Sequence, residues 1–409
     1  MHHTPRNTPH LIGWLSLAQL ISWGSVFYTF ALLLEPVERE LGLSRAQSSL
    51  GFSLALLAEG LLAYPVGRLI DRGHERVVMT GGSLLVALCL ALHSGISSVA
   101  GFYAVWLGLG AGLAATLYQP VFAVVIRRFP NDFRRAIITI TFLGGLASTV
   151  FIPLSAWLIH AVGWRHALLV LAALHLLVCA PLHALMLRHA PAGQAHTSSS
   201  AHAPSLKPHL LSAPFLLVGL FIVLLMGVTA ALPAHMVSLL RENGLPETWV
   251  IAVPAAIGVL QLLGRVLLYF FENHVDLHLA NRLIPGLIPL GLLALLAAPW
   301  FGDAQVAVLL LFVLLYGMGN GMLTIVKGTA IAEYVDRAQV ASLNGALGVP
   351  MALGRAAAPW LLGLLWSPSG GYGAGLWLML GLSLIGVAAL AGAQRLARQR
   401  RAVDPQAAA

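Results

Sequence analysis

Long apolar runs, separated by short polar segments, follow one another along the whole chain. Each run has about 20 residues, the length that an α-helix needs to cross the hydrocarbon core of a bilayer. There are about twelve of them by this criterion. They lie near residues 11–34, 47–69, 77–97, 99–126, 136–160, 164–187, 213–240, 247–271, 283–301, 304–331, 339–366 and 373–394. Because a backbone inside lipid must satisfy its own hydrogen bonds, the pattern predicts an all-α integral membrane protein with twelve transmembrane helices.

Composition supports this interpretation and leaves little room for another fold. Of 409 residues, 58% are hydrophobic and only 9% are charged, and the mean hydropathy is +0.85. Soluble domains contain about 25% charged residues. The connections between the runs are mostly too short to hold a soluble catalytic domain. We therefore expect neither an enzyme nor a bound cofactor.

The distribution of Lys and Arg indicates how the chain lies in the membrane. A net charge of +8 would suggest nucleic-acid binding in a soluble protein. With both termini placed in the cytoplasm, 16 of these cations fall in inside segments, 4 in outside loops and 3 within the spans, as the positive-inside rule requires. We expect a multi-pass protein of a bacterial-type inner (plasma) membrane with both termini cytoplasmic, surrounded by the lipid bilayer and without a nucleic-acid partner.

One long polar segment divides the chain into two halves. Residues 188–212 are rich in Pro, Ser and Ala, which predicts a flexible cytoplasmic linker. It separates a predicted six-helix bundle over 1–187 from a second one over 213–394, and a cytoplasmic tail follows at 395–409.

A glycine pattern supports this duplication. Three glycines at alternate positions in the fourth run return in the tenth: Gly108, Gly110 and Gly112, then Gly317, Gly319 and Gly321. Because 317 − 108 is 209, Lys327 falls opposite Tyr118 at this offset. The glycines follow no strand and lie within apolar runs, which favours close helix packing over a nucleotide-binding loop. We expect two pseudo-symmetric six-helix bundles with a substrate site between them near the midplane.

A short charged island between the second and third runs carries the clearest motif, G-R-L-I-D-R-G-H-E-R at 67–76. Gly67, Asp71, Arg72 and Arg76 match the loop motif between helices 2 and 3 of the major facilitator superfamily, which this chain resembles. The motif's second glycine is displaced here to Gly73.

The resemblance implies a twelve-helix transporter that works by alternating access. In that superfamily the motif's Asp meets the positive N-terminal end of helix 11 and latches the inner gate, so the resemblance implies the same role for Asp71. The corresponding helix end in this chain would be residues 336–340. A charge at a helix terminus contributes about 0.3–1 kcal/mol, and up to about 2 when partly buried, which is enough to bias a gating equilibrium.

A second, looser resemblance covers the first two runs. The stretch W-G-S-V-F-Y-T-F at 23–30, followed by E-P-V-E-R-E-L-G-L-S-R at 35–45, is similar to the monocarboxylate and oxalate transporter branch of the superfamily. It hints at a small organic anion as substrate. In that branch an Arg of helix 8 binds the substrate carboxylate, and Arg265 is its nearest match.

One carboxyl group lies deep within an apolar run. Glu59 is about twelve residues from the outer end of its run, hence close to the midplane. A carboxylate there costs on the order of 2.5–3.5 kcal/mol on insertion scales. Two interpretations remain open, namely a proton-binding site for coupled transport and a protonated or hydrogen-bonded glutamic acid between helices.

Three cations also lie within the runs, Arg265, Lys327 and Arg355. Exposing all three to lipid would cost about 9 kcal/mol, so they should face a cavity or a partner. Arg355, near the midplane, is the first candidate for binding a carboxylate bidentately, although it could instead pair with Glu59 or helix carbonyls. Arg265 is alternatively a degenerate second copy of the loop motif, and Lys327 is long enough to snorkel to the surface.

Three polar side chains in the first and fourth runs complete the candidate substrate site: Tyr28, Tyr118 and Gln119. Motifs for a phosphate loop, a nucleophilic serine or a zinc helix do not occur in the sequence. Cys89 and Cys179 lie within apolar runs, which excludes a disulfide framework. We therefore expect no catalytic residue and no metal, and the linker histidines lack ligand spacing.

These features predict a secondary active transporter that acts as a monomer and moves a small organic anion, such as a monocarboxylate, coupled to protons. The alternative is an exporter of drugs or metabolites, whose cavity should be more apolar and carry fewer cations. A third class is a membrane receptor or structural protein without transport.

Overall fold

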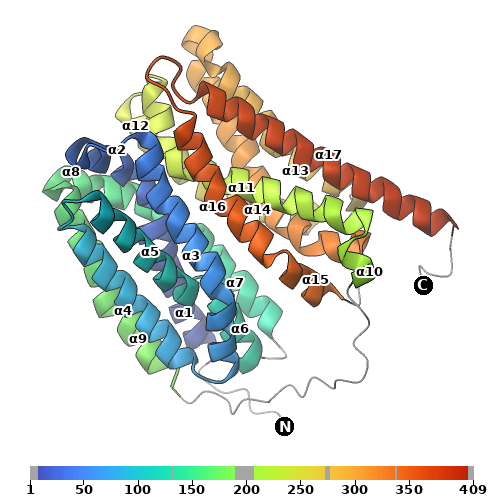
Figure 1. Cartoon of the computed structure of the whole chain (residues 1–409), viewed down its shortest axis with the longest axis horizontal. Coiled ribbons are helices and arrows are strands. Elements are labelled where there is room, and N and C mark those ends of the chain that lie inside the picture. The colour runs from blue at the N-terminus through green and yellow to red at the C-terminus, as the bar shows by residue number, and fades with distance from the viewer. Residues whose placement is uncertain (1–7, 130–131, 189–206, 272–276, 337–338, 404–409) are drawn as a thin grey trace. The chain divides into compact units, whose positions relative to one another are not determined.

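The computed structural model describes residues 8–129, 132–188, 207–271, 277–336 and 339–403. Within these ranges every regular element is helical, apart from one isolated bridge between Ser367 and Gly371 (Figure 1). The helices form two compact units. Unit 1 comprises Met1–Thr197 and Pro233–Gly258, and unit 2 comprises Ser198–Leu232 and Val259–Ala409.

Unit 1 contains the helices of the first half: α1 Thr8–Ser22, η1 Trp23–Tyr28, α2 Phe30–Leu41, α3 Arg45–Asp71, α4 Glu75–His93, α5 Val99–Thr116, α6 Tyr118–Arg128, α7 Phe133–Gly145, α8 Ala147–Leu174, η2 His175–Cys179 and α9 Ala180–Met186. Unit 2 contains α10 Lys207–Leu210, α13 Leu277–Ala297, η3 Ala298–Ala304, α14 Gln305–Tyr334, α15 Val340–Ala346, α16 Gly348–Leu364 and α17 Gly373–Val403. Two helices, α11 Ala213–Glu242 and α12 Glu247–Phe271, contribute residues to both units.

Nine helical stretches among the described residues are long and apolar enough to cross a membrane. Two of these, Arg135–Met186 and His278–Tyr334, have 52 and 57 residues. Since about 20 residues suffice for one crossing, each can cross twice. The first is broken at Gly163, where φ is +78°, and the second at η3. Together with α15 and α16, the stretches account for the twelve predicted spans, so the predicted fold class is confirmed.

Local sequence explains where several of these helices begin and end. Ser44 is the N-cap of α3: its side chain accepts a hydrogen bond from the Gln47 backbone N–H at 3.2 Å, and the Gln47 side chain accepts one from the Ser44 N–H at 2.9 Å. This capping box starts α3 directly after Gly42, whose φ of +66° ends α2. The predicted boundary between the first two spans is confirmed.

One close contact between helices recurs in equivalent form in the two units. In unit 1, Gly110 of α5 lies against the backbone of Ala55 in α3, and a β-carbon on Gly110 would overlap the Ala55 carbonyl oxygen. In unit 2, Gly321 of α14 lies against the backbone of Gln261 in α12 with the same atoms facing each other. Figure 1 shows α3 and α5 side by side. Glycine is required at both positions because any side chain would push the helices apart.

A second pair of glycines shows the same correspondence. Gly108 of α5 faces Cys89 of α4, and Gly319 of α14 faces Leu287 of α13. Each of these glycines therefore meets the third helix of its own half, whereas Gly110 and Gly321 meet the second.

These contacts correct the predicted register of the internal repeat. Both 321 − 110 and 319 − 108 give 211, whereas pairing the glycines in order gives 209. The expectation that Lys327 falls opposite Tyr118 is wrong by two residues, since the packing sets Lys327 opposite Thr116. Pairing the glycines in sequence order gave the wrong register, because the first glycine of one half does not make the same helix contact as the first glycine of the other half.

Candidate functional site

The three intramembrane cations lie in unit 2, one on each of three helices, and all are half-buried. Arg265 of α12 donates from Nε to the Gly321 carbonyl of α14 at 3.2 Å. Lys327 follows six residues later on α14, a rise of about 9 Å. Its ammonium group interacts electrostatically with the guanidinium of Arg355 on α16. The structure thus brings the predicted cations together around α14.

The two neighbouring positive charges of Lys327 and Arg355 favour the binding of an anion. Two cations that repel each other in a poorly hydrated region raise the free energy unless negative charge compensates them. A carboxylate supplies that charge and accepts two parallel hydrogen bonds from a guanidinium. The chemistry available here is therefore binding and orientation of an acidic group.

Glu59 lies in unit 1 on α3, half-buried. It comes four residues after Ala55, and Arg265 comes four residues after Gln261. Because Ala55 and Gln261 make equivalent contacts with glycines of α5 and α14, Glu59 and Arg265 occupy equivalent positions of the repeat. This register favours a mid-helix role for Arg265 over the alternative that it is a second copy of the loop motif.

The predicted tyrosines belong to one row of aromatic rings in unit 1. Tyr28 lies 5.3 Å from Phe27, Phe27 lies 5.1 Å from Trp23, and Trp23 lies 5.2 Å from Tyr118, measured between ring centroids. Tyr118 in turn stacks on Phe122 at 5.3 Å. The row joins η1 to α6, so residues predicted on separate spans are brought together.

Gln119, the third predicted polar residue, is exposed in the first turn of α6. Trp23 was not predicted as a site residue, although it begins the W-G-S-V-F-Y stretch that carries the looser resemblance. Two aromatic residues four positions apart, Trp23 and Phe27, are the signal that could have found the row, because such pairs meet on one helix face.

The loop motif forms the turn between α3 and α4. Asp71 is the last residue of α3 and Arg72 caps it, and both side chains are exposed. Gly73 has φ +88°, so the turn uses the displaced glycine in a left-handed conformation. Gly67 lies within the last turns of α3 with open space where a β-carbon would point.

The buried charge near this turn is Glu75, which sequence reasoning did not select. Its carboxylate accepts hydrogen bonds from Arg128 Nε at 2.6 Å and Arg127 Nη1 at 3.2 Å. Arg76, a predicted motif residue, donates instead to the Ala184 carbonyl at 2.7 Å. The available signal was the Arg127–Arg128 doublet at the end of a span, which needs an acidic partner when it is partly buried.

Some expected sites cannot be placed. The beginning of the predicted eleventh helix includes residues 337–338, and most of the predicted linker is residues 189–206; both segments lie outside the described residues. Of the linker histidines, His209 is described, and its ring lies 3.5 Å from the Asp336 carboxylate. Within the described ranges no cluster of three or more His, Cys, Asp or Glu side chains could hold a metal.

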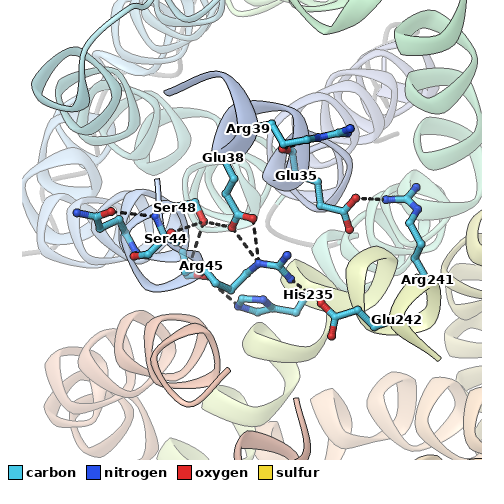
Figure 2. Close-up of polar contacts among 11 residues, drawn as sticks. Glu35, Glu38, Arg39, Ser44, Arg45, Ser48, His235, Arg241 and Glu242 are labelled. Atoms are coloured by element: carbon cyan, nitrogen blue, oxygen red, sulfur yellow. Dashed lines mark hydrogen bonds and ion pairs between the residues drawn. The ribbon is translucent and has the colours of Figure 1, made fainter. Parts of the chain in front are cut away.

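A second charged network lies at the other end of α3 (Figure 2). Arg45 is buried there and contacts Glu38 at 2.9 Å through Nε and Glu242 at 3.3 Å through Nη1. Glu38 also accepts a short hydrogen bond from the Ser48 hydroxyl. The network thus ties α2 and α3 to the end of α11 within unit 1.

Arg241 extends this network at its more exposed edge. Its guanidinium contacts Glu35 at 2.5 Å and Glu247 at 2.6 Å (Figure 2 shows the first pair). Close by, Ser49 Oγ lies 3.3 Å from His235 Nε2. The sequence offered no signal for these partners, which are about 200 residues apart in the chain.

Comparison with known proteins identifies the family. Residues 15–275 match the sequence profile of the Major Facilitator Superfamily. Monocarboxylate transporter 13 of Bos taurus is 30% identical over 311 residues, which cover 70% of this chain and 68% of that protein. Its Rattus norvegicus counterpart is 30% identical over 313 residues, with the same coverage.

Solved structures agree on the fold. A mutant of the nucleoside transporter NupG superposes with a TM-score of 0.75 at 16% identity, covering 94% of this chain and 99% of that one. A D-xylose-proton symporter superposes with a TM-score of 0.74 at 14% identity, covering 93% and 96%. The chain therefore belongs to the major facilitator superfamily and is a multi-pass membrane transporter, not an enzyme.

Proposed function

We propose that this transporter moves a small organic anion, in the first instance a monocarboxylate, together with protons by alternating access. The observation that carries the proposal is the gathering of Arg265, Lys327 and Arg355 around α14 in unit 2. The name of its relative, Monocarboxylate transporter 13, supports the same substrate class.

Each cation has a proposed part in binding. Arg355 supplies a planar fork for the two oxygens of a carboxylate, which Lys cannot match in geometry. Lys327 adds a second positive charge within reach of the same anion. Arg265, the equivalent of Glu59 in the repeat, contributes a third. Tyr28, Tyr118 and Gln119 are proposed as the polar contacts of unit 1 to the rest of the substrate.

Glu59 is the proposed coupling group. A carboxyl group within a span can carry a proton along with the substrate, and acidic residues placed in this way commonly form the proton relays of transporters. Taking one proton with each monocarboxylate makes the transport step electroneutral. The proposal assigns this role to Glu59 because it is the acid placed deepest in the apolar runs.

The loop motif and the charge bias support the remaining parts of the proposal. Gly67, Asp71, Arg72 and Arg76 are proposed to form the cytoplasmic gate, with both termini on that side of a bacterial-type inner membrane. Bundles at 1–187 and 213–394, a linker at 188–212 and a tail at 395–409 remain the proposed functional division of a monomer.

Uptake of labelled lactate, pyruvate and oxalate into proteoliposomes under an imposed proton gradient tests the proposal. Saturable uptake is expected for wild type, with Arg355→Gln abolishing it. Glu59→Gln should retain exchange of labelled for unlabelled substrate but lose accumulation driven by the gradient. Arg398→Gln, which changes an exposed Arg of α17, is the matched control and should behave as wild type.

The same assay separates this proposal from the exporter alternative. The aromatic row of unit 1 favours that alternative, because aromatic rings bind apolar substrates. If no carboxylate is transported and Arg355→Gln still exports hydrophobic dyes at the wild-type rate, the anion proposal fails and the exporter remains.

A further inference from the structure

Two short π-helical segments of unit 1, η1 and η2, meet at a buried hydrogen bond. Ser25 Oγ lies 2.7 Å from His175 Nε2, and both side chains are fully buried. The Ser25 hydroxyl also donates to the Ile21 carbonyl at 2.7 Å. Because a hydroxyl has one hydrogen, His175 Nε2 must be the donor to Ser25, and Nδ1 is left as a bare acceptor. Single π-helical turns are rare and frequently mark functional sites.

Fourteen buried side-chain nitrogen and oxygen atoms of the described residues lack a hydrogen-bond partner, and the free nitrogen of His175 is one of them. The first and sixth spans contribute four others: Ser22 Oγ, Gln19 Oε1, His183 Nε2 and Trp23 Nε1. Trp23 belongs to the aromatic row, and the side chains of the other four residues are buried. Leaving such an atom unsatisfied costs about 1–3 kcal/mol, so a group of them in one place requires an explanation.

These four side chains belong to the first and sixth spans, which the Ser25–His175 hydrogen bond joins, and we call the line between these two spans the seam. Ser22 and Gln19 lie three and six residues before Ser25, and His183 lies eight residues after His175, so successive members are about 60–80° apart around their helices. Counting back from Ser25, Gln19 is about 9 Å away along its helix, and His183 is about 12 Å from His175 along its own. The helix α1 packs against both η2 and α9, so the two spans are neighbours along this length.

The ends of the seam are anchored by ordinary hydrogen bonds. Gln19 Nε2 donates to the Thr116 carbonyl at 2.5 Å, and His183 Nδ1 lies 2.9 Å from Ser83 Oγ. His183 is adjacent to Ala184, whose carbonyl binds Arg76 beside the buried Glu75. The seam therefore runs from the Glu75 end of unit 1 to the middle of the first span.

We propose that this seam binds a file of water molecules, which links His183 to His175 and carries protons between them. Water fits because it donates and accepts at once, and buried waters in proteins typically make about three hydrogen bonds to otherwise unsatisfied groups. A histidine at each end lets the file pass a proton in either direction by exchange of tautomers. As a route for the coupling proton, the seam rests on the proposed proton-coupled function.

Other ionisable groups do not share the seam. The elements packed against η2 are α1, α4, α8 and α9. Apart from His183, and Cys179 within η2 itself, the titratable and charged side chains of these elements have other surroundings. Glu75, Arg76 and Arg165 have polar partners, His93 packs among aromatic rings and Cys89 lies against Gly108. The remaining three are exposed: His10, His160 and His166. The proton on this path is therefore carried by histidine and water without a carboxylate.

Radiolytic hydroxyl labelling tests for the water directly. Radicals formed from bound water oxidise the side chains beside it even when bulk solvent does not reach them. Cys179, on η2 between the two histidines, is 0% exposed, and Cys89 is 5% exposed, away from the seam. Exposure alone predicts that Cys89 reacts faster; the proposal predicts that Cys179 is oxidised severalfold faster. Equal rates, or a faster Cys89, would overturn it.

A variant sharpens this comparison. Ser22→Val removes one seam hydroxyl and puts two methyl groups in its place, and it should slow labelling of Cys179 severalfold while leaving Cys89 unchanged. If the variant does not fold, the wild-type ratio of the two cysteines still decides the matter.

The proton route is tested by the pH change inside proteoliposomes during substrate uptake. His175→Gln retains an amide that can donate to Ser25 but cannot carry a proton, so proton co-movement should fall severalfold while substrate exchange persists. His160→Gln, on the exposed face of α8, is the matched control. Wild-type proton movement in His175→Gln overturns the relay. If wild type transports no carboxylate, the proposed function fails instead. The cysteine labelling then tests for water in the seam independently of transport.

Discussion

Arg265 of α12 occupies in unit 2 the position that Glu59 of α3 occupies in unit 1. Each comes four residues after the residue whose backbone meets a helix-packing glycine, Gln261 in one case and Ala55 in the other. Duplicated halves have thus acquired opposite charges at one equivalent place. Under the proposed function this is a division of tasks, in which one half holds the proton and the other holds the anion.

The first prediction concerns Arg265. Arg265→Gln should raise the KM for a monocarboxylate roughly ten- to a hundredfold, because losing a hydrogen bond to a charged group costs about 1.5–3 kcal/mol. Arg68→Gln, which changes an exposed Arg next to Gly67 of the loop motif, should leave KM unchanged. Initial uptake rates over a range of substrate concentrations measure both. Equal effects of the two substitutions would mean that Arg265 belongs with the loop motif after all.

Glycine packing gives a second prediction, independent of function. Gly321→Ala should destabilise the protein by about 1–3 kcal/mol, because its β-carbon would overlap the backbone of Gln261 and force α12 and α14 apart. Gly328→Ala on the same helix meets nothing within 4 Å, and should stabilise α14 slightly through better helix propensity. Thermal unfolding in detergent should lower Tm for the first and not for the second. If Gly328→Ala lowered Tm more than Gly321→Ala did, the revised repeat register would be contradicted.

The spans and their boundaries could be predicted because lipid imposes a simple rule on the sequence. Apolar length is a local signal, and the structure confirms the fold class that it predicts. The Ser44 cap and the left-handed Gly73 of the loop turn are also local features, which the structure adds. The repeat register could not be fixed in this way. Three glycines at alternate positions look alike in sequence, and only the neighbouring helix reveals which of them is packed against it.

Charge pairing was harder to predict, for a related reason. Arg45 and Glu242 are 197 residues apart, and each looks like an ordinary loop charge until the helices are assembled. Near the loop motif, the resemblance directed attention to Asp71, although Glu75 is the buried acid. Sequence indicates that a charge within a span needs a partner, but tertiary structure decides which one.

This contrast yields a third prediction. Glu75→Gln should destabilise the fold by about 3–5 kcal/mol, because it leaves Arg127 and Arg128 close together without their counter-charge. Asp71→Asn should leave Tm nearly unchanged, since Asp71 is exposed, and should slow transport if the motif gates the pathway. Measuring Tm and flux on the same preparations separates the two roles. A stable, active Glu75→Gln would mean that the ion cluster has no structural part.

The network around Arg45 (Figure 2) and the Arg241–Glu247 pair beside it allow a final comparison between a buried and an exposed ion pair of the same chain. Arg45 and Glu38 are 8% and 12% exposed, whereas Arg241 and Glu247 are 39% and 63% exposed. Removing one partner of the buried pair strands a charge and should cost about 3–5 kcal/mol, and the exposed pair should contribute about 0.2–1 kcal/mol.

Double-mutant cycles on unfolding free energy, run at low salt and in 1 M NaCl, measure both couplings. At 1 M salt the Debye length is about 3 Å, so the Arg241–Glu247 coupling should nearly vanish. The Arg45–Glu38 coupling should persist, because mobile ions do not enter the buried site to screen it. If salt weakened both pairs equally, Arg45 would be solvated in the membrane-embedded protein, and this end of unit 1 would be open to water.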